Sequence, residues 1–253
     1  MCLLLFAYNV HPEFPFILAG NRDEFYNRPT EQATFWKDHP SILAGRDLEK
    51  LGTWMGVTKS GKFAALTNYR DPNETNEGKE SRGKLVADYL NSSVTTEEYL
   101  SIINNNRLRY PGYNLVFGDF TSLWYYSNIN NEPKELTSGL YGLSNHLLNT
   151  SWPKVDRGVE GLKACMNKTT LDMECLFSVL GNNEEAPDHM LPQTGVSFEW
   201  EKKLSPLFIK TSDYGTRTST VILLDKTNKL KFIERTYNDQ MVDDRCFSFQ
   251  IED

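Results

Sequence analysis

The chain has 253 residues, with 27 basic and 34 acidic side chains and a formal net charge of −7. This negative mean field would repel nucleic-acid phosphates, and no stripe of Lys and Arg appears, so no nucleic-acid partner is expected. The apolar runs are shorter than the roughly 20 residues of a membrane-spanning helix, and the start lacks the basic segment of a secretory signal. We therefore expect a cytoplasmic protein without a transmembrane segment; the sequence does not indicate its oligomeric state.

The composition is that of one enzyme-sized domain. A chain of 253 residues lies near the upper limit for a single hydrophobic core, and the sequence shows no repeat and no tract typical of a linker, so we expect one domain over residues 1–253. The four cysteines have no CxxC spacing, and Cys165 and Cys175 fall in segments with a helical pattern. We expect free thiols and no disulfide framework.

The first twenty-four residues organise the rest of the chain. Leu3–Tyr8 and Phe14–Ala19 each have the length of a buried strand, and residues 9–13 between them carry the Asn and Pro of a turn. An antiparallel hairpin would return the end of the second strand to the start of the first. The quartet at residues 21–24, Asn-Arg-Asp-Glu, would then lie beside Cys2.

This placement would make Cys2 a candidate nucleophile. The guanidinium of Arg22 would lower the pKa of the thiol, and the carboxylate of Asp23 would orient its partners. Removal of Met1 would add an α-amine with a pKa of roughly 7.7–8.0 as the general base. In the alternative interpretation Cys2 is a small apolar strand residue, and the charged quartet caps a turn.

The rest of the chain alternates between strand and helix patterns. Strands are predicted at residues 42–44, 53–58, 63–67, 113–117, 123–126, 134–137, 140–143, 218–224, 230–236 and 246–251. Helices are predicted from Ser81, after a capping box at Thr95–Glu98, from Pro153, and over Asp172–Leu180. Residues 181–204 read as a long surface loop that could cover the site. This pattern is typical of a layered α+β domain.

Seven ordered motifs support a resemblance to a known family. Besides the quartet that follows Met1-Cys2, they lie at residues 45–47, 52–54, 67–70, 81–83, 142–145 and 215–220. With these motifs the chain resembles the NRDE family, which includes the transport and Golgi organisation protein 2 proteins. That family is similar to the N-terminal-nucleophile hydrolases, nearest to the bile-salt hydrolase and penicillin V acylase group. The resemblance implies a four-layer αββα sandwich of antiparallel sheets.

The resemblance also implies roles for particular residues. Arg22 and Asp23 match positions that flank the nucleophile, Asn68 and Asn145 match the amide donors for a developing oxyanion, and Arg217 matches the residue that balances the charge of the nucleophile. Each of them has a structural alternative. Arg22 and Asp23 could form a salt bridge at a turn, and the two asparagines and Arg217 could bind backbone groups at strand ends.

Three further residues are predicted to bind substrate, namely Asn21, Arg70 and His146, although a lone His at a strand end is more often structural. The four histidines lack metal-ligand spacing and no glycine-rich phosphate loop is present, so neither a metal site nor a cofactor is expected.

Two functional hypotheses follow, and each has a small-molecule partner. In the first, the Cys2 thiolate hydrolyses a carbon–nitrogen amide through a thioester, as in a cysteine amidase. In the alternative, which the resemblance suggests, the same pocket binds a hydrophobic ligand without catalysis and serves haem or lipid and acyl-CoA trafficking. A retained Met1 or a blocked N-terminus would favour the second hypothesis.

Overall fold

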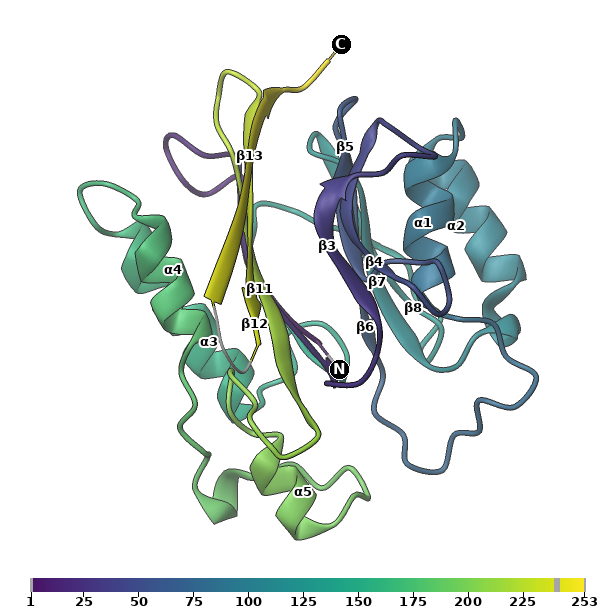
Figure 1. Ribbon diagram of the computed structural model, residues 1–253, viewed down its shortest axis with the longest axis vertical. Coiled ribbons are helices and arrows are strands. Elements are labelled where there is room, and N and C mark those ends of the chain that lie inside the picture. Colours follow the sequence, from purple (N-terminus) through teal and green to yellow (C-terminus); the bar gives the residue numbers. More distant parts are fainter. Residues whose placement is uncertain (1, 239–241, 253) are drawn as a thin grey trace. The chain divides into compact units, whose positions relative to one another are not determined.

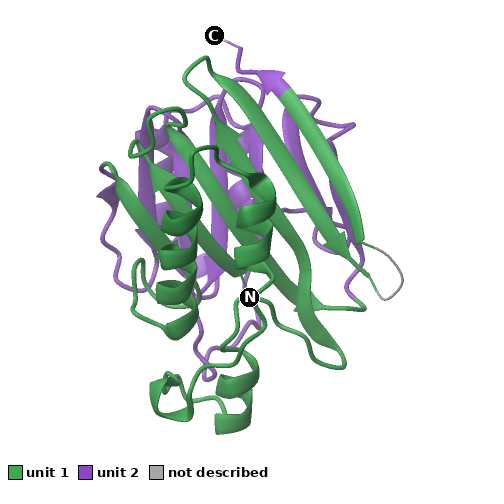
Figure 2. Ribbon diagram, turned by 90° about the vertical axis from the view of Figure 1, so that its left-hand side faces the viewer, with its two compact units in different colours: residues 1–27, 138–248 green, residues 28–137, 249–253 purple. Residues whose placement is uncertain are grey.

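The computed structural model describes residues 2–238 and 242–252, and the chain forms two compact units (Figures 1 and 2). The first unit combines residues up to Asn27 with Ser138–Ser248, and the second combines Arg28–Thr137 with the last few residues. Each unit contains one antiparallel sheet. The chain therefore begins in the first unit, completes most of the second and then returns. The expectation of one domain over residues 1–253 stays a prediction.

The first unit contains a six-stranded sheet in the order β10-β1-β2-β11-β12-β13. Its strands are β1 (Cys2–Tyr8), β2 (Phe16–Phe25), β10 (Gly139–Leu143), β11 (Tyr214–Leu224), β12 (Lys229–Tyr237) and β13 (Val242–Gln250). The opening hairpin is confirmed, but β2 continues through the charged quartet and does not end before it. The quartet stays extended because β1 and β11 pair with it from both sides.

Helices α3 (Pro153–Met166) and α4 (Met173–Leu180) cover one face of this sheet. Pro153 is the first residue of α3, as predicted, and Asp172 caps α4 by accepting a hydrogen bond from the backbone N–H of Glu174. The packing is close because Gly158 of α3 lacks a side chain: a Cβ there would lie 2.7 Å from Leu5. Their shared core contains Leu3, Leu5, Ala7, Ile17, Ala19, Val155, Leu162, Leu176, Leu180, Val221 and Leu223.

The predicted loop at residues 181–204 contains two short helices, η2 (Asp188–Met190) and α5 (Phe198–Lys203). Sequence periodicity could not show them, since six residues make fewer than two helical turns. Glu201 of α5 is buried and accepts hydrogen bonds from the Thr194 backbone N–H (2.8 Å) and hydroxyl (2.6 Å). The segment thus has internal structure of its own, while a role in covering the site stays a prediction.

The second unit contains a seven-stranded sheet in the order β3-β4-β5-β6-β7-β8-β9. Its strands are β3 (Thr30–Phe35), β4 (Ile42–Asp47), β5 (Met55–Thr58), β6 (Lys62–Asn68), β7 (Tyr113–Asp119), β8 (Ser122–Ser127) and β9 (Lys134–Glu135). Strand β3 was not predicted. This strand forms one edge of the sheet, and its first residues are polar, so it lacks the apolar alternation of a half-buried strand.

Helices α1 (Gly83–Asn91) and α2 (Thr96–Asn105) pack on one face of this second sheet, and a short turn, η1 (Arg107–Arg109), follows them. The predicted capping box is present. The Thr95 hydroxyl accepts from the Glu98 backbone N–H (3.2 Å), and the Thr95 N–H donates to the Glu98 carboxylate (2.9 Å). Each unit thus pairs one sheet with one helical layer, and the fold class is α+β, as predicted. Among the described helices, none has the length and apolarity needed to cross a membrane.

The expectation of four free thiols is wrong for one pair. Cys165 near the end of α3 and Cys175 in the first turn of α4 form a disulfide, with Cα atoms 5.8 Å apart. This pairing could not be predicted from sequence, because the position of a cysteine within a helix does not show that two consecutive helices pack side by side. Cys2 and Cys246 remain free.

The disulfide should stabilise the first unit. Its loop spans a sequence separation of 10 residues. A loop of this size constrains the unfolded chain by about 2–3 kcal/mol in the chain-entropy model. We expect a Cys165→Ala/Cys175→Ala double variant to lose about that much free energy of unfolding in urea.

Thiol titration of the unfolded, unreduced protein should find two free thiols, and four after reduction. Cys246→Ser is the matched control because Cys246 is exposed and unbridged. Four free thiols in carefully unreduced protein would show that the bridge does not form.

Candidate functional site

Strand register brings Cys2 and Arg22 together. Cys2 lies directly opposite Arg22 on β2, Arg22 lies opposite Thr218 on β11, and Thr218 lies opposite Thr236 on β12. Residues paired in this way point to the same face of a sheet. The four side chains therefore form a row across four neighbouring strands, on the face away from α3 and α4.

Asn145 lies close to the Cys2 end of this row. Strand β10 pairs with β1 as far as Leu143, opposite Leu4, and Asn145 follows two residues later. The Ser144 hydroxyl donates to the Cys2 carbonyl oxygen (3.4 Å) and to Oδ1 of the fully buried Asn145 (3.1 Å). Because Oδ1 of Asn145 accepts this bond, the nitrogen of the same side-chain amide is the atom that can donate a hydrogen bond.

Asp23 points to the face covered by the helices. Its Oδ1 accepts a hydrogen bond from the Thr216 hydroxyl (2.7 Å), and its backbone oxygen accepts from the Tyr214 hydroxyl (3.2 Å). Burial raises the pKa of Asp23, against the lowering effect of the nearby Lys154 ammonium and the Thr216 hydrogen bond. Asp23 is thus a buried carboxylate beside the first strand and not a surface salt-bridge partner of Arg22.

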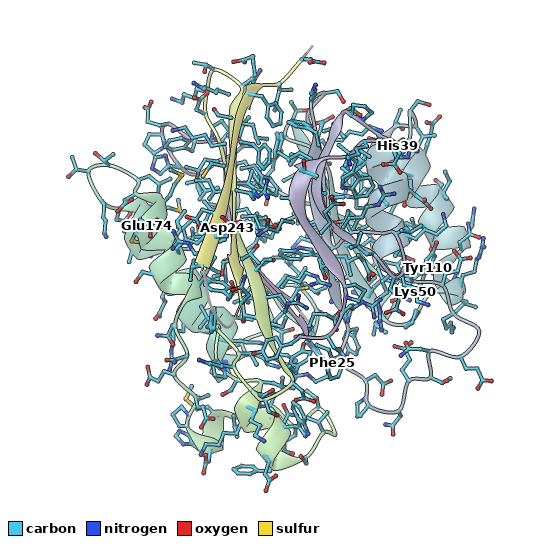
Figure 3. The ribbon with its side chains drawn as sticks, viewed as in Figure 1. Phe25, His39, Lys50, Tyr110, Glu174 and Asp243 are labelled. Atoms are coloured by element: carbon cyan, nitrogen blue, oxygen red, sulfur yellow. A yellow bond between two sulfur atoms is a disulfide. The ribbon has the colours of Figure 1, made fainter. Side chains whose placement is uncertain are left out.

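A β-bulge between Thr216 and Thr218 explains the position of Arg217. Thr216 pairs with Asp23 and Thr218 with Arg22, so Arg217 is an extra residue on β11. Its guanidinium donates to the Phe25 carbonyl (2.8 Å; Phe25 is labelled in Figure 3), and burial together with the charge of Arg22 lowers its pKa. Arg217 is thus next in sequence to Thr218, the residue paired with Arg22, and its role in balancing the charge of the nucleophile stays a prediction.

Asn21 makes hydrogen bonds within its own unit, and its predicted role in substrate binding stays a prediction. It is fully buried on the helix side, and its amide nitrogen donates to the carbonyls of Leu180 (2.9 Å) and Leu207 (2.8 Å). Its Oδ1 accepts from the Ser219 hydroxyl (2.6 Å). Both amide atoms are used within the chain, so we assign Asn21 a supporting role.

His146 also makes contacts within its own unit. Its Nδ1 lies 2.9 Å from the Thr150 hydroxyl, and its ring packs against Trp152 at a centroid distance of 5.8 Å. Partial burial lowers its pKa, which favours the neutral ring at pH 7. These contacts fit the structural interpretation of His146, and its predicted role in substrate binding stays a prediction.

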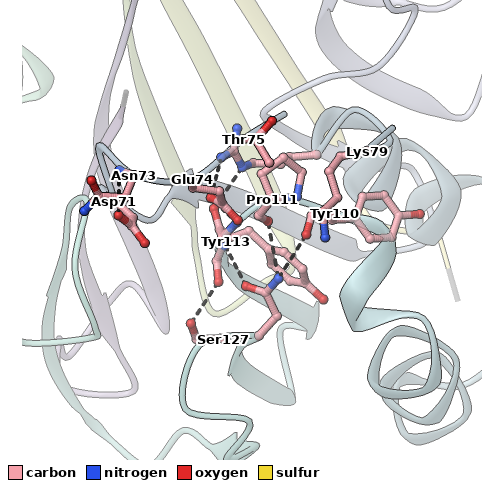
Figure 4. A network of polar contacts seen from close by, with 12 residues as sticks. Asp71, Asn73, Glu74, Thr75, Lys79, Tyr110, Pro111, Tyr113 and Ser127 are labelled. Carbon is pink, nitrogen blue, oxygen red and sulfur yellow. Dashed lines mark hydrogen bonds and ion pairs between the residues drawn. The ribbon is translucent and has the colours of Figure 1, made fainter. Parts of the chain in front are cut away.

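Asn68 and Arg70 belong to the second unit. Asn68 ends β6 opposite Tyr113, and Arg70 begins the loop that follows. Figure 4 shows the polar network behind this loop: the Glu74 carboxylate accepts from the Gly112 backbone N–H (2.7 Å) and forms an ion pair with Arg82 (3.6 Å). The network fixes the loop within its unit. Roles for Asn68 as an oxyanion donor and for Arg70 in substrate binding stay predictions.

The expected lowering of the Cys2 pKa is wrong for the chain that carries Met1. Burial raises the pKa of the thiol from its ordinary value of 9.0 to about 11, and the negative charge of Asp23 adds to this effect. Arg22 acts in the predicted direction but is the weaker influence. Proximity to a cation cannot lower the pKa of a thiol when loss of hydration costs more.

Several polar groups on the same face of the sheet as Cys2 have unused hydrogen-bonding capacity. Within the described part of the chain, Nη1 of Arg22 and the hydroxyls of Thr218, Thr220 and Thr236 are buried without a hydrogen-bond partner. Buried polar groups of this kind are uncommon in folded proteins and call for a ligand or ordered water. Thr218 and Thr220 belong to the motif at residues 215–220. Only Arg217 of that motif was predicted as a site residue, because the sequence does not show which strand pairs with it and hence which face its threonines occupy.

Metal chemistry has no support among residues 2–238 and 242–252, where no group of three or more His, Cys, Asp or Glu side chains could hold an ion.

The sequence comparison identifies one family. The model for Transport and Golgi organisation 2 matches residues 1–239. The Transport and Golgi organization 2 homolog of Mus musculus is 35% identical over 95% of this chain and 94% of its own length. The Homo sapiens homolog is 36% identical over 95% of this chain and 94% of its own length.

Two solved structures share the fold at low sequence identity. A C2A mutant of conjugated bile acid hydrolase from Clostridium perfringens has a TM-score of 0.54 at 11% identity, over 100% of this chain and 97% of its own. A Caenorhabditis elegans ortholog of N-acylethanolamine-hydrolyzing acid amidase has a TM-score of 0.53 at 10% identity, over 88% and 92% of the two chains. The fold is therefore that of the N-terminal-nucleophile hydrolases.

The raised pKa of Cys2 predicts slow alkylation of the chain that retains Met1. Two pKa units reduce the thiolate fraction at neutral pH about 100-fold, so iodoacetamide should modify the exposed Cys246 at least about 100-fold faster than Cys2. The Cys2 rate should keep rising up to pH about 11. The folded chain retains the thiol proton between pH 9 and 11, so the free energy of unfolding should fall across that interval, and less steeply in Cys2→Ala, where tyrosines whose pKa burial also raises, such as Tyr89, still contribute. Equal labelling of both thiols at pH 7 would contradict this assignment.

Asn21 and Asp23 should respond differently to substitution. Asn21→Leu leaves two buried carbonyls without donors, and we expect a loss of about 1–3 kcal/mol for each in urea unfolding. Asp23→Asn keeps an oxygen for Thr216 and removes a buried ionisable group, so the free energy of unfolding at pH 7 should stay the same or rise. Because burial raises the Asp23 pKa, its destabilising effect appears as pH rises above the ordinary value of 3.8. A stable Asn21→Leu protein would remove the supporting role.

Proposed function

Since this chain belongs to the Transport and Golgi organisation 2 family and has the fold of the N-terminal-nucleophile hydrolases, we propose that it hydrolyses a carbon–nitrogen amide with Cys2 as nucleophile. The observation that carries the proposal is the pairing of Cys2 with Arg22, together with the Ser144 hydroxyl that contacts both the Cys2 carbonyl oxygen and the Asn145 amide oxygen. It combines a sulfur nucleophile, an amide donor and a fixed cation, as acyl transfer requires.

Removal of Met1 supplies the missing base in this proposal. The α-amine of Cys2 takes the thiol proton, and the sulfur attacks the amide carbonyl carbon. The carbon–nitrogen bond then breaks, the amine leaves with the proton held by the α-ammonium, and a thioester remains on Cys2. Water attacks the thioester while the α-amine accepts its proton. The carbon–sulfur bond then breaks, the α-ammonium returns that proton to the sulfur, and the carboxylic acid leaves. With Met1 in place there is no such base, and the raised pKa keeps the thiol protonated.

The side chains on the two sides of Cys2 would orient the substrate in the site. Asn145 stabilises the negative oxygen of the tetrahedral intermediate on the β10 side of Cys2. Part of the substrate then extends the other way, over Nη1 of Arg22 and the hydroxyls of Thr218 and Thr236, which lack hydrogen-bond partners among the described residues. Nη2 of Arg22 forms an ion pair with Glu24 (3.8 Å). We propose that this part is the amine, and that it carries hydroxyl or carboxylate groups.

A second candidate function is non-catalytic binding of haem or of a lipid or acyl-CoA ligand, with no resident cofactor in either case. The observation in its favour is the buried, high-pKa thiol, which by itself is a poor nucleophile. The names of the relatives, which refer to transport and Golgi organisation, agree with a trafficking role.

Intact-mass measurement tests the first function. Protein treated with methionine aminopeptidase and incubated with N-acyl amides should gain one acyl group on residue 2, and protein that retains Met1 should not. Cys2→Ser should accumulate an ester because oxygen esters react more slowly with nitrogen and sulfur bases than thioesters do, and Cys2→Ala should give no adduct. Cys246→Ser is the matched control, since it removes the other free thiol and should leave the adduct unchanged.

The amides are best used in matched pairs that share an acyl chain. An N-acyl ethanolamine and the corresponding N-acyl propylamine differ by one hydroxyl, which the polar row should recognise. Thr218→Val should reduce the preference for the hydroxylated amine and leave the acyl preference intact. Absence of any adduct, together with haem or lipid binding that survives Cys2→Ser, would reject hydrolysis and support the carrier.

A further inference from the structure

A pocket lies in the first unit, remote from Cys2. It encloses about 510 Å³ and is formed by the β1–β2 turn, the α3–α4 connection and the β11–β12 turn. The β1–β2 turn joins the end of the hairpin where Tyr8 pairs with Phe16, whereas Cys2 pairs with Arg22 at the opposite end. Strand rise separates these ends by roughly 20 Å. The pocket is therefore distinct from the candidate site.

Positive charge surrounds this pocket in an otherwise acidic protein. Four lysines line it, namely Lys168, Lys226, Lys229 and Lys231, against two acidic residues, Glu13 and Asp225. Within the described part of the chain, none of the four ammonium groups is in an ion pair. The Asp225 carboxylate is held by its own turn, where it accepts from the Thr227 hydroxyl (2.6 Å) and the Lys229 backbone N–H (3.1 Å). The lysines thus repel one another and attract anions.

Apolar side chains form the other part of the lining. Phe14, Met166 and Leu171 are half-buried, and Leu223 is buried. His11 stands among them with its ring fixed: Nδ1 accepts from the backbone N–H groups of Glu13 (3.1 Å) and Phe14 (3.2 Å). The ring proton therefore lies on Nε2, which can donate to a ligand.

We propose that this pocket binds a phosphate ester that carries a compact apolar group. Lysine ammonium groups are suited to phosphate as mobile point charges with three donors each, and the apolar lining accepts the organic part. The volume is within the usual range of about 300–1,000 Å³ for small-molecule sites. The proposal stands independently of amide hydrolysis because it uses none of the residues around Cys2.

The test measures binding of the probe 1-naphthyl phosphate to the full-length protein by fluorescence titration. The probe should bind with one-to-one stoichiometry and more tightly than 1-naphthol or inorganic phosphate alone. Lys229→Glu/Lys231→Glu should weaken binding about tenfold or more because two charged hydrogen-bond donors are replaced by repelling carboxylates. Raising the salt concentration should weaken binding to the unmodified protein.

The matched control is Lys203→Glu/Lys210→Glu, which makes the same change of charge at two exposed lysines outside the pocket of the same unit. It should alter the dissociation constant less than about twofold, since distant exposed charges are screened. Circular dichroism and melting temperature check that both variants fold. Equal weakening in both variants, or no saturable binding at millimolar probe, would overturn the proposal.

A vesicle sedimentation experiment distinguishes a lipid headgroup from a soluble phosphate ester as the ligand. Phosphatidylcholine vesicles with and without phosphatidic acid are sedimented with the protein. Sedimentation that needs phosphatidic acid, is lost in Lys229→Glu/Lys231→Glu and is reversed by 1-naphthyl phosphate assigns the site to a lipid headgroup. Saturable probe binding without sedimentation assigns it to a soluble phosphate ester.

Discussion

The pairing of β2 with strands on both of its edges is the constraint on which the candidate site depends. Main-chain hydrogen bonds to β1 and β11 fix its register over the whole charged quartet. A slip of one residue would exchange the two faces, because side chains alternate along a strand. Arg22 would then point towards the helices, and Asn21 would lose its carbonyl partners. The buried core of the first unit therefore holds the chemistry in place, although no core residue takes part in it.

The face of the sheet that carries Cys2 changes character along its length. Towards the turns it is apolar, with Phe6, Phe16, Leu18, Ile222 and Phe232 buried, and towards Cys2 it becomes polar. A folded chain rarely keeps buried hydroxyls and a guanidinium nitrogen without partners unless something else satisfies them. The polar end is costly for folding alone, and this cost is the reason to regard it as a binding surface.

Local patterns predicted most of the fold. The opening hairpin, the Thr95 capping box and Pro153 at the start of α3 were all visible because each depends on residues close in sequence. The failures depend on long-range contacts. The quartet became part of a strand because β11, almost two hundred residues away, pairs with it, and Cys165 met Cys175 because two helices pack. The Cys2 pKa was misjudged because burial cannot be read from a neighbouring charge.

The extra residue on β11 has a consequence for how this chain can vary in length. Thr216 and Thr218 would point to the same face of a regular strand, yet here the first serves Asp23 and the second lies beside Arg22. Deletion of Arg217 alone would restore regular alternation and leave both hydroxyls on their present sides of the sheet. Loss of one residue is thus compatible with the pairing of β11 at the bulge, whereas a deletion elsewhere in the strand would move the residues on one side of it to the opposite face.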